Sequence, residues 1–173
     1  MPDALRDAVA ALAGAWAVRT GRAFASDRVP AAGMEGTEPF AEPERGELAA
    51  ALAAALDGHE GPVVLVAADV PRLDDELAAA ALSDLASGGS LSFAPATDAR
   101  PYLLALAGPA PELLAFAGAG EEDRATIAGR AAELGGEVGL LRSERRLVTP
   151  ADARALAIDP LVPADLRALA ASA

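Results

Sequence analysis

The chain has 173 residues, of which 53% are hydrophobic and 23% charged, so we expect one folded domain with a substantial core. It carries 26 acidic residues against 14 arginines and no lysine, and its net charge of −12 argues against binding to nucleic acid or to anionic membranes. The absence of lysine and cysteine excludes Schiff-base chemistry, thiol nucleophiles, disulfides and zinc–thiolate sites.

The remaining compositional features point to a cytoplasmic protein. No apolar run approaches the roughly 20 residues of a membrane span, and the first residues do not resemble a signal peptide. The lone histidine, His59, lies in a turn-like Asp-Gly-His-Glu-Gly-Pro segment, and we expect it to be solvated.

The N-terminal third predicts two helices separated by a long loop. Apolar residues at helical spacing predict a helix over residues 3–14, with Asp3 as its cap. A short strand is an alternative for residues 15–19, which are ambiguous. Three prolines in residues 26–43 predict a long loop, and the alanine- and leucine-rich segment 44–57 predicts the second helix.

The centre of the chain predicts a βαβ unit. Residues 62–68 form a short apolar run rich in valine, which is typical of a fully buried, parallel strand. A helix over 74–86 follows, with Asp74 as its N-cap and acidic residues in its first turn. Residues 90–95 predict the next strand, reached by a right-handed crossover.

The rest of the chain predicts a strand, two helices, a further strand and two closing helices, at residues 101–107, 109–117, 121–134, 137–142, from 149 and from 163. The strand over 101–107 is a candidate for antiparallel pairing. Thr149 and Asp152 have the spacing of a capping box, with Pro150 at the first helical position. Together, these elements predict one domain over residues 1–173, a three-layer α/β/α fold with a mainly parallel central sheet.

Asp69 is the first candidate for chemistry. It directly follows the buried strand, and ligands of open α/β sheets bind beyond the carboxyl ends of their strands. A carboxylate at this position can coordinate a divalent cation, which would take nucleotide phosphates as its other ligands. The alternative, equally weighted from position alone, is that Asp69 only caps the following turn.

Asp98 and Arg100 are the second candidates. Asp98 ends the loop after the 90–95 strand, so it is expected to face the same crevice as Asp69, and Arg100 offers a bidentate fork to phosphate or carboxylate. The alternative is an Asx-type turn with an exposed arginine. Tyr102 is expected to pack with a wet tip, and Trp16 to lie in the core.

Charge clusters elsewhere have simpler explanations. Arg142, Arg145 and Arg146 form a small basic patch able to attract phosphate, but arginines in a loop are usually solvated. Acidic triplets at 74–76 and 121–123 stand at predicted helix starts, where they complement the helix dipole.

The chain resembles a bacterial glycosyltransferase-like family whose naming borrows from arsenosugar biosynthesis. Four segments carry the resemblance in the right order: Arg45–Leu56, Val63–Leu73, Phe93–Leu104 and Leu140–Asp152. That family belongs to the nucleotide-diphospho-sugar transferase superfamily, so the resemblance implies a GT-A fold. It also implies that Asp69, in an Asp-x-Pro turn with Pro71, holds Mg²⁺ or Mn²⁺ and a nucleotide or nucleotide sugar. Asp98 would contact the sugar or acceptor during transfer, with Arg100 beside it.

Departures from the family's pattern keep two functions open. The chain begins at what resembles the family's first helix, so we expect its first strand and phosphate loop to be lacking. Val148 stands where the family has a second likely metal ligand. One hypothesis is therefore an active, metal-assisted glycosyl- or nucleotidyltransferase. The other is a degenerate member that serves as a small-molecule-binding or interaction subunit. A sheet edge exposed by the lost strand would favour a homodimer.

Overall fold

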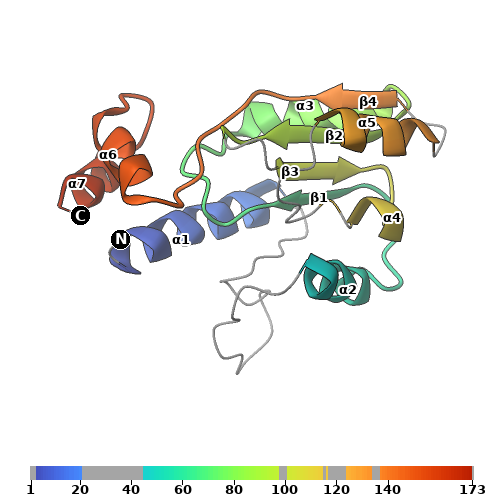
Figure 1. Cartoon of the computed structure of the whole chain (residues 1–173), viewed down its shortest axis with the longest axis horizontal. Helices are drawn as coiled ribbons and strands as arrows, with labels where there is room; N and C mark the ends of the chain where they lie inside the picture. Colours follow the sequence, from blue (N-terminus) through green and yellow to red (C-terminus); the bar gives the residue numbers. More distant parts are fainter. Residues whose placement is uncertain are drawn as a thin grey trace.

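The computed structural model describes residues 3–20, 45–97, 101–114, 116, 124–133 and 137–172. In these parts of the chain, seven helices surround a four-stranded sheet (Figure 1). The helices are α1 (Asp3–Thr20), α2 (Arg45–Ala55), α3 (Asp75–Ala86), α4 (Pro111–Leu114), α5 (Arg124–Glu133), α6 (Pro150–Ile158) and α7 (Ala164–Ala171). The strands are β1 (Val63–Val66), β2 (Gly89–Pro95), β3 (Pro101–Leu106) and β4 (Glu137–Leu140).

The sheet has the order β1-β3-β2-β4. β3 pairs antiparallel with both β1 and β2, whereas β2 and β4 pair in parallel. Three of the four strands therefore run in one direction, and β3 opposes them. β3 is antiparallel, as the sequence suggested, and it lies between β1 and β2, the two strands of the predicted βαβ unit.

Helices cover both faces of the sheet, which confirms the three-layer α/β/α architecture. Alternate strand residues point to opposite faces. Val64 and Val66 pack with α3 and the C-terminal half of α1, while Val63 and Leu65 pack with α2, α4 and α5. All four β1 residues are buried, as expected, but among the described strands β1 pairs only with β3 and in antiparallel fashion, so the expectation of a parallel strand was wrong.

α1 runs through Thr20, so the alternative of a strand over 15–19 was wrong. Gly14 does not end the helix, because the buried face continues past it. Val9, Ala13, Trp16 and Ala17 are all buried and stand three or four positions apart. Trp16 lies in the core as expected, and its indole Nε1 donates a hydrogen bond to the carbonyl oxygen of Asp74 at 2.9 Å.

A third, smaller core lies beyond the end of the sheet. The N-terminal half of α1 packs there against α6 and α7, through Leu5, Val9, Leu156 and Leu166 (Figure 1). The predicted capping box begins α6, since Thr149 and Asp152 each accept a hydrogen bond from the other's backbone nitrogen. α1 therefore links the sheet to a small helical unit. None of the described helices is long and apolar enough to cross a membrane.

Candidate functional site

The three co-directional strands bring their following segments together at one end of the sheet. Residues 141–148, which follow β4, run across the ends of β2 and then β1. The Thr97 backbone nitrogen donates to the Glu144 carbonyl oxygen at 3.0 Å, and the Leu147 nitrogen donates to the Asp69 carbonyl oxygen at 2.8 Å. This is the edge at which ligands of open α/β sheets bind.

Asp69 lies three residues beyond β1, which ends at Val66 and not at residue 68 as predicted, and its carboxylate already has a partner. Arg146 Nε lies 2.8 Å from Oδ1 and 3.0 Å from Oδ2, and Arg146 Nη2 lies 2.8 Å from Oδ2. The side chains of Arg146 and Asp69 are only 17% and 24% exposed. Both carboxylate oxygens therefore accept charge-assisted hydrogen bonds in a bidentate pair.

The donor set around Asp69 does not fit Mg²⁺ or Mn²⁺. Such cations require several oxygen ligands, usually with one or two carboxylates. A metal at Asp69 would have to displace the guanidinium of Arg146 from both oxygens. Among the described residues, no group of three acidic or histidine side chains stands close enough to hold a metal ion. Val148, where the resemblance led us to expect a second metal ligand to be replaced, is an exposed apolar side chain.

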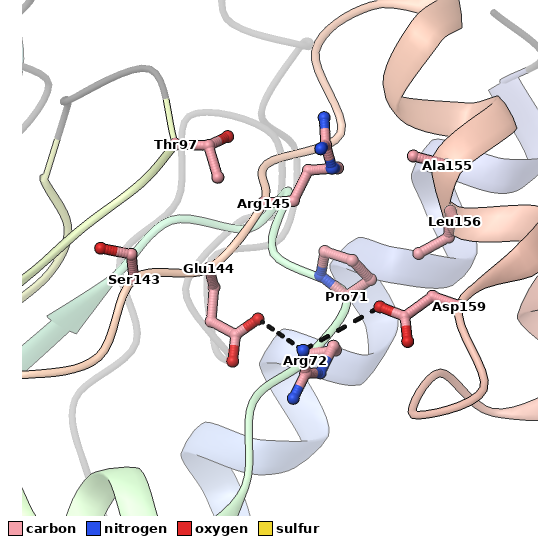
Figure 2. A pocket seen from close by; sticks show the side chains of 9 residues that line it. All are labelled: Pro71, Arg72, Thr97, Ser143, Glu144, Arg145, Ala155, Leu156 and Asp159. Carbon is pink, nitrogen blue, oxygen red and sulfur yellow. Dashed lines mark ion pairs between the residues drawn. The ribbon is translucent and has the colours of Figure 1, made fainter.

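A cavity of about 210 Å³ lies at the ends of the strands, beside Pro71 (Figure 2). It is lined by residues from four segments: Pro71, Arg72, Thr97, Ser143, Glu144, Arg145, Ala155, Leu156 and Asp159. The lining contains two arginines and two carboxylates, so its formal charge is balanced. Hydroxyl groups and a small apolar wall complete it.

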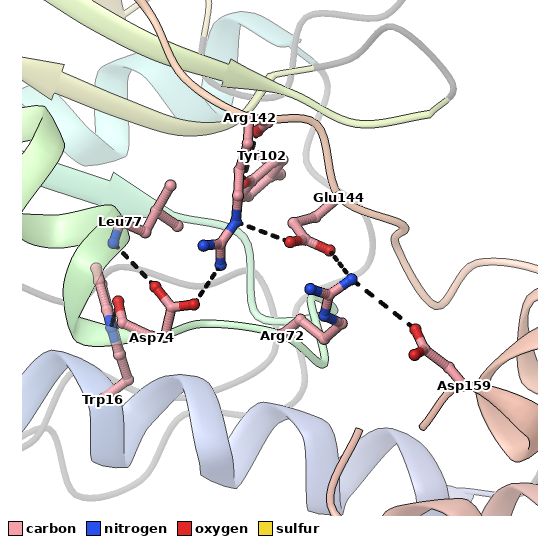
Figure 3. A network of polar contacts seen from close by, with 8 residues as sticks. All are labelled: Trp16, Arg72, Asp74, Leu77, Tyr102, Arg142, Glu144 and Asp159. Atoms are coloured by element: carbon pink, nitrogen blue, oxygen red, sulfur yellow. Dashed lines mark hydrogen bonds and ion pairs between the residues drawn. The ribbon is translucent and has the colours of Figure 1, made fainter. Parts of the chain in front are cut away.

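Glu144 is the most buried charged residue of this region. Only 4% of its side chain is exposed, and it lies between two arginines (Figure 3). Arg142 Nε donates to Glu144 Oε1 at 2.9 Å, and Arg72 Nη1 lies 3.3 Å from Oε2. The two cations offset the cost of burying this carboxylate.

The network extends from Glu144 in both directions. Arg72 Nη1 also approaches Asp159 Oδ2 of the α6 end at 3.9 Å. On the other side, Arg142 Nη2 donates to Asp74 Oδ2 at 2.6 Å, while the Leu77 nitrogen donates to Asp74 Oδ1, confirming Asp74 as the α3 N-cap. This chain of charges joins α3, the sheet ends and α6.

Burial and pairing set the ionisation of these groups. Burial alone would raise the pKa of Asp74, but hydrogen bonds from Arg142 and Leu77 outweigh it and hold that pKa below its ordinary value. Burial likewise opposes the charge of Arg142, whose pKa is nevertheless raised by Asp74. Burial of Tyr102, reinforced by the charge of Glu144, raises the pKa of the phenol. Its hydroxyl donates to the Arg142 carbonyl oxygen at 3.0 Å.

The predicted site residues have different outcomes. Asp69 and Pro71 lie at the strand-end crevice, where Pro71 lines the cavity. Asp98 and Arg100 lie outside the described residues. The expectation that the arginine patch is simply solvated holds for Arg145, which is exposed, but not for the partly buried Arg142 and Arg146; all three pair with a carboxylate. Sequence reasoning missed Glu144 and Arg72. The only sequence feature that could have identified them is their position a few residues after a strand.

Comparison with known proteins supports the fold. Residues 36–119, just under half of the chain, match a family described as "Uncharacterized protein conserved in bacteria (DUF2064)". The structure superposes on that of a "putative nucleotide-diphospho-sugar transferase" from Desulfovibrio desulfuricans G20 with a TM-score of 0.56 and 20% sequence identity. The match covers 86% of this chain and 72% of the other. The fold is of the nucleotide-diphospho-sugar transferase type. No curated protein matches the chain.

Proposed function

We propose that this protein uses the nucleotide-diphospho-sugar transferase fold to bind a small polar molecule without a divalent metal. This is the degenerate alternative of the two functions suggested by the sequence. The observation that carries it is the bidentate pair between Asp69 and Arg146. In a metal-assisted transferase, the carboxylate at this position would be available to a cation.

The side chains of Asp69 and Arg146 are both partly buried, which makes their ion pair costly to break. Removing one member of a hydrogen-bonded, partly buried ion pair leaves the other without its partner, and hydrogen bonds to charged groups contribute about 1.5–3 kcal/mol. A divalent cation would have to compensate for this loss, and it would place its charge near that of Arg146. The pair therefore favours the protein without metal.

The volume and the lining of the strand-end cavity indicate which class of ligand it would bind. Its volume of about 210 Å³ lies below the roughly 300–1,000 Å³ of pockets that enclose drug-sized ligands. A nucleotide diphosphate sugar is larger than that, so the cavity suits a molecule of monosaccharide or amino-acid size. Balanced charges and hydroxyl groups in its lining favour a neutral or zwitterionic ligand with several hydrogen-bonding groups.

Thermal unfolding with added ligands tests this proposal. We would measure Tm with monosaccharides, polyols, amino acids, nucleotides and nucleotide sugars, each with and without Mg²⁺ or Mn²⁺. A ligand present at 100 times its Kd adds about 2.7 kcal/mol of stability, which shifts Tm by a few degrees. We expect at least one small polar ligand to raise Tm independently of metal, and Ala155→Leu, which fills the cavity, to abolish that rise.

Two further variants, Ala125→Leu and Asp69→Asn, help to interpret the result. Ala125→Leu makes the same substitution on an exposed face of α5, outside the cavity, and should leave ligand binding unchanged. A Tm shift that requires both a nucleotide sugar and Mn²⁺, and that disappears in Asp69→Asn, would overturn the proposal and support metal-assisted transfer. The absence of any shift across the whole panel would also contradict it.

A further inference from the structure

A second cavity lies on the other side of Arg72. It has a volume of about 320 Å³ and is bounded by α1, by residues 70–74 and by the turn before α7. Arg72 and Pro71 line both this cavity and the smaller one at the strand ends. The volume falls within the range of small-molecule sites.

Most of the residues that line the second cavity are apolar, although its lining surface is about equally polar and apolar. Its lining includes Leu12 and Trp16 of α1, Val70 and Leu73 after β1, and Leu161 before α7. Leu12 and Leu161 are 40% and 67% exposed, although both are large hydrophobic side chains. A ligand with an apolar body would cover these side chains and gain free energy in proportion to the apolar area removed from water.

The cavity also contains one cation with unused donors. Both ion pairs of Arg72 are made by Nη1, at 3.3 Å to Glu144 and 3.9 Å to Asp159 (Figure 3). No hydrogen bond of its Nε or Nη2 is found among the described residues. The other charged group in the lining, Asp74, accepts hydrogen bonds on both oxygens, from Leu77 and Arg142. The donors available to an anionic ligand in this cavity are therefore Nε and Nη2 of Arg72.

We propose that this second cavity binds an amphipathic monoanion, with its acidic group on Arg72 and its apolar body between Leu12, Trp16 and Leu161. A carboxylate suits the remaining donors of Arg72, because a guanidinium presents its N–H groups as a planar fork. The inference is separate from the proposed function, since it concerns a different cavity and a different class of ligand.

Trp16 provides a direct measurement, because it is the only tryptophan of the chain and lines the cavity. We would titrate the protein with octanoate and follow the fluorescence emission of Trp16. Octan-1-ol, with the same body and no charge, and acetate, with the charge and no body, serve as comparison probes. We expect a saturable change with octanoate, about tenfold weaker binding of octan-1-ol, and no saturable change with acetate.

Two variants and two controls locate the site. Arg72→Gln should weaken octanoate binding about tenfold while leaving octan-1-ol binding unchanged. Leu161→Asp should weaken octanoate binding because it places a carboxylate beside the ligand and removes apolar contact. Ile158→Asp is its matched control, since Ile158 is 82% exposed and does not line the cavity. Ala155→Leu, in the strand-end cavity, should have no effect on octanoate.

Three outcomes would overturn the inference: no saturable response to octanoate, equal affinity for octan-1-ol, or an Arg72→Gln variant that is folded by circular dichroism and binds octanoate as tightly as the wild type. If Arg72→Gln fails to fold, Leu161→Asp decides the question. Leu161 is largely exposed, and its substitution should leave the fold intact.

Discussion

Arg146 donates three hydrogen bonds to the carboxylate of Asp69, although the two residues lie 77 positions apart in the sequence. The neighbouring Leu147 nitrogen donates to the Asp69 carbonyl oxygen at 2.8 Å. Asp69 thus holds residues 141–148, the segment that follows β4, through both its side chain and its backbone. These contacts occupy both carboxylate oxygens of Asp69 and hold residues 141–148 across the end of the sheet.

Breaking this pair should lower stability measurably. We expect Asp69→Asn and Arg146→Gln each to reduce the free energy of unfolding by about 1–3 kcal/mol, because each leaves a partly buried charge without its partner. The double variant should lose less than the sum of the two single losses. Urea unfolding of the four proteins measures this coupling. Arg130→Gln, which breaks an exposed pair with Glu133, should change stability by at most about 1 kcal/mol. If the effects of Asp69→Asn and Arg146→Gln were strictly additive, the ion pair would contribute nothing to the free energy of unfolding.

The capping box of α6 should make stability depend on pH in the acid range. Burial alone would raise the pKa of Asp152, but hydrogen bonds from Thr149 and Arg145 hold it below the ordinary value of 3.8. A carboxyl whose pKa is lower in the folded state stabilises the fold above its unfolded pKa, and this contribution is lost as the pH falls below 3.8 and through the folded pKa.

Asp152→Asn should therefore lower the free energy of unfolding by about 1 kcal/mol at pH 7, with a difference that shrinks below pH 4. Urea unfolding across this range measures it. Asp165→Asn, in the first turn of α7, is the control, because the side chain of Asp165 makes no hydrogen bond within the described part of the chain and its substitution should have a small effect at pH 7. A difference at Asp152 that stays constant down to acid pH would contradict the prediction.

Tyr102 should resist ionisation until the protein unfolds. Its pKa is raised chiefly by burial, so folding favours the neutral phenol, and this stabilisation is present below the ordinary pKa of 10.0 and lost as the pH rises above it. Because Tyr102 is the only tyrosine, absorbance at alkaline pH reports this group alone. We expect its titration to coincide with the loss of circular dichroism. A midpoint near 10 in the folded protein would be inconsistent with the buried position.

Gly139 should be far less tolerant of alanine than Gly129. A Cβ at Gly139 would overlap Asp84 Oδ2 and lie 2.6 Å from Ser92 Oγ, two atoms already joined by a hydrogen bond of 2.7 Å. Gly139→Ala should therefore lower the free energy of unfolding by about 1–3 kcal/mol. A Cβ at Gly129, on the exposed face of α5, would meet open space. Gly129→Ala should therefore raise the free energy of unfolding by about 0.4–1 kcal/mol. Thermal unfolding of the two variants compares these opposite signs.

Local chemistry explains which elements were predictable. The caps at Asp74 and Thr149 depend on atoms within three residues, and both formed as expected. The valine-rich run at β1 was predicted to be buried, and it is. The helix predicted over 109–117 has its described helical turn at Pro111–Leu114. The end of α1 depends on tertiary contacts and not on the local sequence. The helix continues past Gly14 because Trp16 packs against α3 and the sheet.

The candidate site shows the same division. The sequence by itself determined an acidic α/β protein without lysine or cysteine, with a buried strand leading into Asp69. Only the tertiary structure decided that β3 separates β1 from β2 and that Arg146 occupies the carboxylate of Asp69. Strand order and ion pairing join residues far apart in the chain, and they follow from which faces bury together and which charges then meet. The spacing of residues along the sequence does not determine which strands become neighbours or which charges meet.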